Sequence, residues 1–434
     1  MTDARTPFGL WSGIGLVVAN MIGVGVFLST GFMAQSMAPG TILLAWGVGT
    51  VLALAGARAY GEVATLVPES GGEYRYLSTL LHPALGSLAG WASLLVGFSA
   101  PIAADALGAG DYAQKLFPAV DPLWFGAALV VLITALHAVG LHVSARAQNA
   151  LVVVKVLLLT AFLALGLFAG HLGFPTWVPP SPAKEPVSDF VGSLFYIAFA
   201  FSGWNAAVYA ASEFTDAKRT VPRAMVLGCG LVAALYLLLN YVFVANLTPE
   251  QLSIVFRFDS EKVTVGHALA LALGGPVAAQ ALSGIILLAF ISAMSAMTLV
   301  GPRVYAAMAK DGVLPRALAG KDGKPPTLSV LLQGVLALAV LFTHTLQEVL
   351  KNVGAILVLF AALTVAGLFW AGRRIPGATV KPIALVCAAV YLGSAAVMLY
   401  FGFLGKTHLL WWVGGVALVA LLAWAASPAR RRPA

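Results

Sequence analysis

The sequence predicts an all-α integral membrane protein. Of its 434 residues, 60% are hydrophobic and only 10% are charged, with a mean hydropathy of +0.93, whereas an average soluble domain carries roughly 25% charged residues. Apolar runs of about 20 residues recur along the whole chain, and each is long enough to cross a hydrocarbon core of about 30 Å as a helix. A transmembrane β-barrel would instead alternate apolar and polar residues. The first run lacks a basic n-region and a small-residue cleavage site, so we expect a retained span rather than a signal peptide.

The apolar runs give about twelve predicted spans. They are 11–36, 40–66, 84–108, 123–142, 148–171, 189–212, 224–246, 276–303, 327–344, 351–371, 382–404 and 408–426. If the spans alternate in direction, most loop Lys and Arg residues fall on one side, including those of 308–326 and the tail Arg430 to Arg432. The positive-inside rule then places both termini in the cytoplasm. We expect a multi-pass protein of the cell (inner) membrane.

Glycine interrupts two of these spans. Span one contains "ANMIGVGVFLST", with Gly23 and Gly25 halfway across, and span six contains "FYIAFAFSGWNAAVYAASEF", with Ser202 and Gly203 at mid-depth. Interrupted spans at matching positions in two halves indicate the binding site of a transporter built from inverted repeats. The predicted organisation is one transmembrane domain (1–434) with a first repeat (11–171), an inverted repeat (189–371) and two further spans (382–426).

The chemistry of such breaks favours a zwitterionic ligand. Backbone polar groups cannot be left unpaired in hydrocarbon, so a span breaks only where it meets protein or lines a cavity. A half-helix that begins at a break exposes N–H groups that suit a carboxylate, and one that ends there exposes carbonyls that suit an ammonium or a metal cation. The α-amino acid head group satisfies both ends. The alternative is that the glycines only allow close helix packing.

Four motifs in order resemble the amino acid–polyamine–organocation superfamily. They are "IGVGVFLSTG" in span one, "PESGGEYRYL" after span two, "FSGWNAAVYAASEF" in span six and "GPRVYAAMAKDGVLP" after span eight. The span-six motif is most similar to the L-type amino acid transporters and their bacterial relatives. The resemblance implies the LeuT-type fold, with five spans, five inverted spans and two more at the C-terminus, and alternating access around a central site.

The same resemblance implies the residues of that site. Those expected to bind substrate are Ile22, Gly23, Val24, Gly25, Phe199, Ala200, Ser202 and Asn205. The backbone of the first four would hold the carboxylate, and the carbonyls of Phe199, Ala200 and Ser202 would hold the amine. Phe199 would also act as an aromatic lid over the substrate, Trp204 would pack the broken region, and Asn205 would hydrogen-bond near the substrate. Core packing for Phe199 and a helix–helix hydrogen bond for Asn205 are the alternatives.

Lys155 places an ammonium within the apolar span five, "NALVVVKVLLLTAF". An ionisable residue inside the membrane indicates function by default, with snorkelling to a span end as the alternative. The resemblance implies that Lys155 replaces the sodium ion of sodium-coupled relatives and meets the carbonyls of Ala19 and Ile22. As a fixed cation it would support sodium-independent exchange or facilitated transport, and as a group that loads and releases a proton it would drive symport. The sequence leaves both roles open.

Span eight supplies two candidate partners for that lysine. Ser292 and Ser295 lie three residues apart in "ISAMSAMT" and therefore share a helix face. Hydrogen bonds from these serines to their own helix are the alternative.

The acidic residues favour a neutral substrate. Glu62 and Glu213 fall near predicted cytoplasmic span ends, Asp105 lies toward the outer end of span three, and Asp111 lies just beyond it. A cationic substrate would require a buried carboxylate deep in the site, and none is evident from the sequence. We expect a neutral L-amino acid of small to medium size. Asp105 keeps a cationic amino acid or a polyamine as the alternative.

Other classes fit less well. A membrane-embedded enzyme would need a catalytic cluster such as H-E-x-x-H, but the histidines are scattered, and His137 and His142 are five apart, which is poor spacing for a shared metal. A channel would more often show a symmetric pore-lining ring. We expect no cofactor and no metal, buried packing for Cys229 and Cys387, and partners limited to the amino acid and the lipid bilayer, without nucleic acid. Proton coupling and oligomeric state stay open.

Overall fold

The structure, a computed structural model, describes residues 8–34, 36–140, 145–170, 173–178, 186–246, 265–320, 326–403 and 407–426. These residues form helices joined by turns and loops, and their β-structure is limited to an isolated bridge between Phe8 and Phe214. The predicted all-α fold is confirmed.

The helices follow in chain order. They are α1 (Leu10–Met21), α2 (Val24–Met33), α3 (Pro39–Leu66), α4 (Gly72–Leu80), α5 (Pro83–Ala92), α6 (Ser99–Leu116), α7 (Pro122–Ala138), α8 (Ala145–Ala169), α9 (Pro186–Ala200), α10 (Ala206–Tyr209), α11 (Ala217–Asn246), α13 (Val265–Lys310), α14 (Thr327–Thr343), α15 (Leu346–Ala366), α16 (Ala371–Arg374), α17 (Pro382–Phe403) and α18 (Thr407–Ala426). A π-helical turn, Ser93–Gly97, joins α5 to α6.

The helix boundaries follow local sequence signals. Pro39, Pro83 and Pro122 open α3, α5 and α7, where proline costs no hydrogen bond because the first helical N–H has no partner inside the helix. Thr345 and Glu348 form a capping box at the start of α15. The sequence prediction did not include α4, a short helix between spans two and three.

Eight apolar helical segments in the described part of the chain are long enough to cross a membrane, and four shorter apolar helices accompany them. The shorter ones include α9, which is short because span six is interrupted after it. The predicted count of twelve spans stays a prediction.

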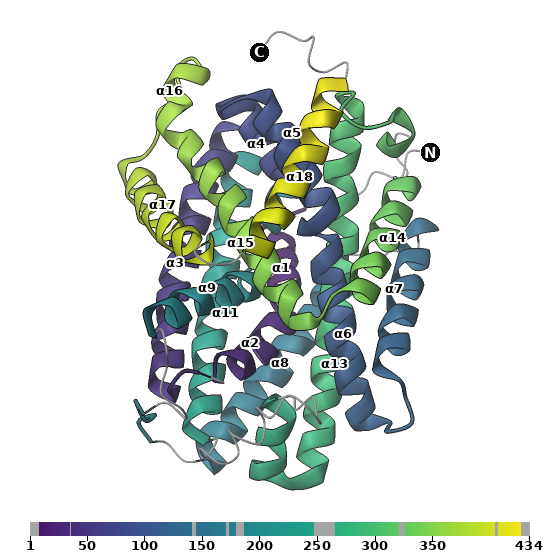
Figure 1. The fold of residues 1–434 in the computed structure, drawn as a ribbon, viewed down its shortest axis with the longest axis vertical. Helices are drawn as coiled ribbons and strands as arrows, with labels where there is room; N and C mark the ends of the chain where they lie inside the picture. The colour runs from purple at the N-terminus through teal and green to yellow at the C-terminus, as the bar shows by residue number, and fades with distance from the viewer. Residues whose placement is uncertain are drawn as a thin grey trace.

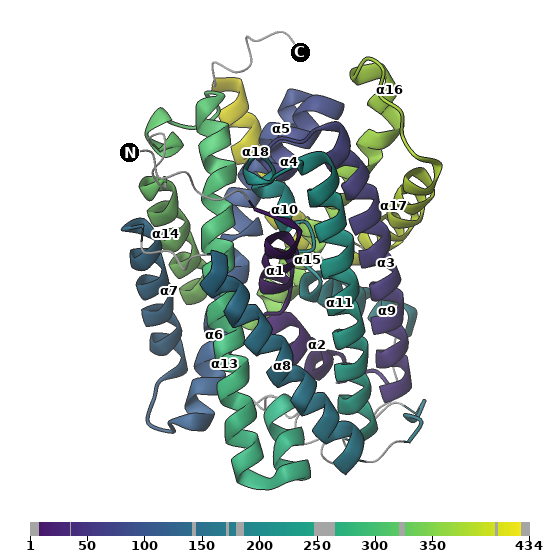
Figure 2. The ribbon, with the colours of Figure 1, turned by 180° about the vertical axis from the view of Figure 1, so that it is seen from behind.

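The broken first span lies at the centre of the molecule. The most hydrophobic window of Leu10–Met33 is fully buried among other helices. In Figures 1 and 2, α1 is surrounded by the longer helices, and it packs on α8, α11 and α13, while α2 packs on α9 and α13. A helix can break inside a membrane only where protein or water covers its free backbone groups, and this central position meets that condition.

The helices α4, α5 and α16 lie together at one end of the molecule, the upper end in Figure 1. This is the end predicted to face the cytoplasm. Part of the charge on which that prediction depends, namely Lys321, Lys324 and the tail Arg430 to Arg432, lies outside the described residues. The orientation in the membrane therefore stays a prediction.

Candidate functional site

Span one is interrupted at the predicted glycines. Between the end of α1 at Met21 and the start of α2 at Val24, Ile22 (φ −79°, ψ 87°) and Gly23 leave the helical conformation. The Gly23 N–H donates to the Met21 carbonyl at 2.9 Å. Because the terminal carbonyls and N–H groups of each half-helix lack helical partners, the break places polar backbone groups in the middle of the span.

Span six is interrupted in the same way. The helix α9 ends at Ala200, and α10 begins only at Ala206. Between them Gly203 has φ +100°, a left-handed conformation that glycine adopts without strain. The Ser202 N–H donates to the Phe199 carbonyl at 2.9 Å, and the Phe199 side chain is buried.

The two breaks pack directly on each other through glycines. A Cβ atom at Gly25 would lie 2.5 Å from the Cα of Ala200, and one at Gly203 would lie 2.8 Å from the Asn20 carbonyl carbon. Real side chains do not approach so closely, so these positions require glycine for close packing. Gly25 therefore allows close helix packing, as the alternative explanation held, and the chain also breaks at Gly23, so the two explanations do not exclude each other.

Tyr236 of α11 joins the two breaks, and the sequence analysis missed it. Its fully buried hydroxyl lies 2.6 Å from the Met21 carbonyl oxygen and 3.1 Å from that of Ala200. A phenol has one proton to donate, so the hydroxyl is shared between the C-terminal ends of α1 and α9. The only sequence signal was a polar ring within an apolar span.

Lys155 lies where the sequence analysis expected it. The side chain is 4% exposed, and its Nζ donates to the Ile22 carbonyl at 3.0 Å and to the Ala19 carbonyl at 3.4 Å. The ammonium thus covers the carbonyls at the end of α1, which is the chemistry that a bound cation would supply.

Ser292 and Ser295 do not join this lysine. The Ser295 Oγ lies 3.0 Å from the Nε2 of His137 on α7, and the buried Ser292 Oγ has no hydrogen-bond partner among the described residues. The two serines do share a helix, but Ser295 bonds to α7 rather than to α8, so the expectation that it meets Lys155 is wrong in this structure. For Ser292 the contact with Lys155 stays a prediction.

Asp105 corrects the expectation that no carboxylate lies deep in the site. It belongs to α6 and is 2% exposed, and its Oδ1 accepts a hydrogen bond from the Val24 N–H at 2.7 Å. The carboxylate therefore caps the N-terminus of α2, two residues after the Ile22 carbonyl that accepts from Lys155. The sequence places Asp105 toward the outer end of its span and so does not predict this contact. The contact forms because α6 passes beside the break.

Asn205 makes hydrogen bonds within the protein. Its Nδ2 donates to the Glu73 Oε1 at 2.6 Å and to the Tyr209 hydroxyl at 2.9 Å, and the Tyr60 hydroxyl donates to the same Glu73 oxygen at 2.9 Å. Trp204 packs edge-on against the Tyr60 ring, with centroids 4.8 Å apart. Glu73 had no role predicted from the sequence, although this acid follows two glycines in "PESGGEYRYL".

A family model described as "Amino acid permease" matches residues 8–422 of the chain. The chain belongs to the amino acid permease family. It is 30% identical over 416 residues to the large neutral amino acids transporter small subunit 2 of Rattus norvegicus, covering 92% of this chain and 76% of that one. It is 27% identical over 282 residues to the Asc-type amino acid transporter 1 of Homo sapiens, covering 61% of this chain and 52% of that one. The permease is thus a multi-pass membrane transporter of amino acids in the predicted superfamily, and not an enzyme.

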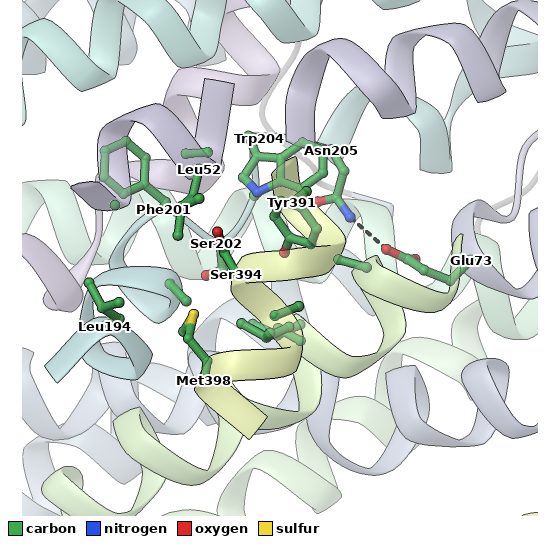
Figure 3. Close-up of a pocket in the computed structure, with 18 residues that line it drawn as sticks. Leu52, Glu73, Leu194, Phe201, Ser202, Trp204, Asn205, Tyr391, Ser394 and Met398 are labelled. Carbon is green, nitrogen blue, oxygen red and sulfur yellow. Dashed lines mark hydrogen bonds between the residues drawn. The ribbon is translucent and has the colours of Figure 1, made fainter. Parts of the chain in front are cut away.

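A cavity lies beside the second break of the permease (Figure 3). Apolar side chains of α3, α9, α15 and α17 form most of its wall, and the break supplies Ser202, Trp204 and Asn205, with Glu73 and Tyr391 close by. The cavity wall includes none of Ile22 to Gly25.

Polar contacts hold the permease together at the end predicted to face the cytoplasm. Phe8, just before α1, exchanges backbone hydrogen bonds with Glu213 and Thr215, at 2.9 and 3.1 Å. The Glu213 carboxylate also pairs with the Arg303 guanidinium at 2.5 and 3.0 Å. Glu213 therefore joins three segments at the span end where the sequence places it.

Proposed function

We propose that this permease carries a neutral L-amino acid of small to medium size across the cell membrane without sodium, by alternating access around the two breaks. The observation that carries the proposal is the position of the Lys155 ammonium, 3.0 Å from the Ile22 carbonyl oxygen and 3.4 Å from that of Ala19. A built-in cation on these carbonyls leaves no role for a sodium ion. The same lysine is compatible with exchange and with proton symport, and the transport assay below distinguishes them.

The head group of an amino acid fits the polar groups of the breaks. The N–H groups at the start of α2, at Val24 and Gly25, are suited to a carboxylate, and the carbonyls of Phe199, Ala200 and Ser202 are suited to an ammonium. In this proposal Phe199, which is buried beside the break, covers the bound substrate as an aromatic lid.

The charges around the first break favour a neutral substrate. Asp105 and Lys155 are both buried and of opposite sign, so the pair contributes no net charge when both are ionised. A zwitterion adds no net charge to this site, whereas a cation would leave an uncompensated charge in a low-dielectric environment, which is costly. The names of the relatives, which include large neutral amino acids, agree with this preference.

A cationic amino acid or a polyamine is the second candidate. The observation that favours it is the Oδ2 atom of Asp105, which is buried and has no hydrogen-bond partner among the described residues. An ammonium would satisfy this oxygen. Competition between labelled L-leucine and unlabelled L-arginine or putrescine separates the two candidates.

The organisation follows from the same proposal. The breaks after α1 and after α9 belong to two inverted repeats, at 11–171 and 189–371, followed by two further spans at 382–426. The mutual packing of the two breaks supports this arrangement, because inverted repeats bring their discontinuous helices together at the middle of the membrane.

Uptake into proteoliposomes tests the proposal. The purified full-length protein is reconstituted, and uptake of labelled L-leucine and L-alanine is measured with sodium or choline, with or without internal amino acid, and with or without a pH gradient; protein-free liposomes serve as the control. We expect uptake that is unchanged when choline replaces sodium. Stimulation by internal amino acid would indicate exchange, and stimulation by an acidic exterior would indicate symport. A strict sodium requirement, or no uptake of any neutral amino acid, would refute the proposal.

A further inference from the structure

The carboxylate of Asp105 occupies the position in which an amino acid would place its own. The first helical residue of α2 is Val24, and its N-cap, Gly23, has no side chain with which to satisfy the exposed N–H groups. Asp105 supplies the missing acceptor from a different helix, with its Oδ1 2.7 Å from the Val24 nitrogen. An N–H at a half-helix N-terminus is also the group best suited to a substrate carboxylate.

Gly23 makes this approach possible. A Cβ atom at Gly23 would lie 2.7 Å from the Oδ1 and 3.2 Å from the Oδ2 of Asp105. Any larger residue would move the carboxylate away from the break. The carboxylate therefore lies against the backbone as closely as a bound ligand would.

The carboxylate is only partly satisfied in this position. Its Oδ2 is buried and accepts no hydrogen bond from the described residues. A buried ionised oxygen without a donor is costly, and capping carboxylates are most stable when they accept several N–H groups. The contact is therefore one that a better ligand can displace.

We propose that Asp105 is a built-in substitute for the substrate carboxylate, which holds the Val24 N–H in the empty permease and yields it when an amino acid binds. The inference rests on the proposed function and adds to it a competition inside the site. On release, the Asp105 carboxylate remains at the same break as the Lys155 ammonium, which donates to the Ile22 carbonyl two residues before Val24. Every amino acid then binds more weakly than the breaks alone would allow, because part of its binding energy displaces Asp105.

Equilibrium binding of labelled L-leucine to the purified full-length protein tests this competition. The variants are Asp105→Ala, which removes the competitor, and the isosteric Asp105→Asn, which weakens it. Asp111→Asn is the matched control, since it makes the same chemical change six residues further along the same buried helix. Isoamylamine, which is leucine without its carboxylate, is the matched ligand.

We expect Asp105→Ala to bind L-leucine about tenfold more tightly than the wild type, and Asp105→Asn to fall between them, because removing an internal competitor raises the apparent affinity. Isoamylamine should gain nothing in either variant. Folding of each Asp105 variant is judged by its melting temperature. In a folded variant, unchanged or weaker L-leucine binding would overturn the inference. A loss of isoamylamine binding would also overturn it, because Asp105 would then be a ligand of the ammonium. Where Asp105→Ala fails to fold, Asp105→Asn decides alone. A wild-type protein that binds no neutral amino acid refutes the proposed function instead.

Discussion

Replacing Lys155 by methionine removes the ammonium while keeping a flexible side chain of similar length. The Nζ atom donates to the carbonyls of Ile22 and Ala19 at 3.0 and 3.4 Å, and the side chain is 4% exposed. Lys155→Met therefore leaves two buried carbonyls without this donor. It also removes the buried positive charge from the break at which the buried carboxylate of Asp105 lies.

The cost follows from these contacts. Hydrogen bonds to charged groups contribute about 1.5–3 kcal/mol each. The 3.4 Å contact is too long to contribute much, so we take about 3 kcal/mol, the upper end of the range for the one short hydrogen bond to Ile22. If that loss falls on the conformation that binds substrate, the affinity drops about 100-fold, because about 1.4 kcal/mol corresponds to a factor of ten.

Binding of labelled L-leucine and the melting temperature of the purified protein measure this effect. Lys310→Met is the matched control, because Lys310 lies exposed at the end of α13. In a double-mutant cycle read from the melting temperature, adding Asp105→Asn to Lys155→Met should cost less stability than the sum of the single changes, since the second change removes a buried negative charge from a break that has lost its positive one. Wild-type affinity and melting temperature in Lys155→Met would refute the role of this lysine as the built-in cation of the break. Strict additivity in the cycle would refute its electrostatic interaction with Asp105.

Three further substitutions test the packing of the two breaks and the polar contacts at the end predicted to face the cytoplasm. Tyr236→Phe removes the hydroxyl shared by the two breaks and should destabilise the protein by about 1–3 kcal/mol. An unchanged melting temperature would contradict the role of this hydroxyl in joining the breaks. Gly25→Ala would place a methyl group 2.5 Å from a backbone atom of α9 and should cost about 1–3 kcal/mol, whereas Gly192→Ala, which meets open space, should cost little. Arg303→Gln breaks the partly exposed pair with Glu213 and should change the melting temperature little but speed efflux from preloaded proteoliposomes; unchanged efflux argues against a gate.

The sequence was sufficient to predict the positions of the two breaks and, through the family resemblance, the two carbonyls that the lysine meets. Gly23 and Gly203 interrupt apolar runs, and the free backbone groups of a broken helix follow from helix geometry alone. Lys155 was identifiable because an ammonium in an apolar span requires partners, and the family resemblance implied the carbonyls of Ala19 and Ile22 as those partners.

The contacts between helices were not predictable in the same way. Asp105 was placed near the outer end of its span, and Ser295 was expected to face Lys155, whereas the structure gives these side chains Val24 and His137 as partners. Both errors concern the tilt and rotation of a helix about its axis. Packing against neighbouring helices sets these quantities, and the spacing of residues along one helix does not contain them.

The observed contacts imply that the first break is already occupied before any substrate binds. Lys155 donates to the Ile22 carbonyl, Tyr236 donates to the Met21 carbonyl, and Asp105 accepts from the Val24 N–H. Each of these side chains comes from a different helix, so tertiary contacts satisfy the Met21 and Ile22 carbonyls and the Val24 N–H. A substrate that binds there, as proposed, replaces these hydrogen bonds, and its net gain on binding is the difference between the two sets. Moderate affinity follows, and a carrier needs it, because a substrate held too tightly on one side of the membrane would not be released on the other.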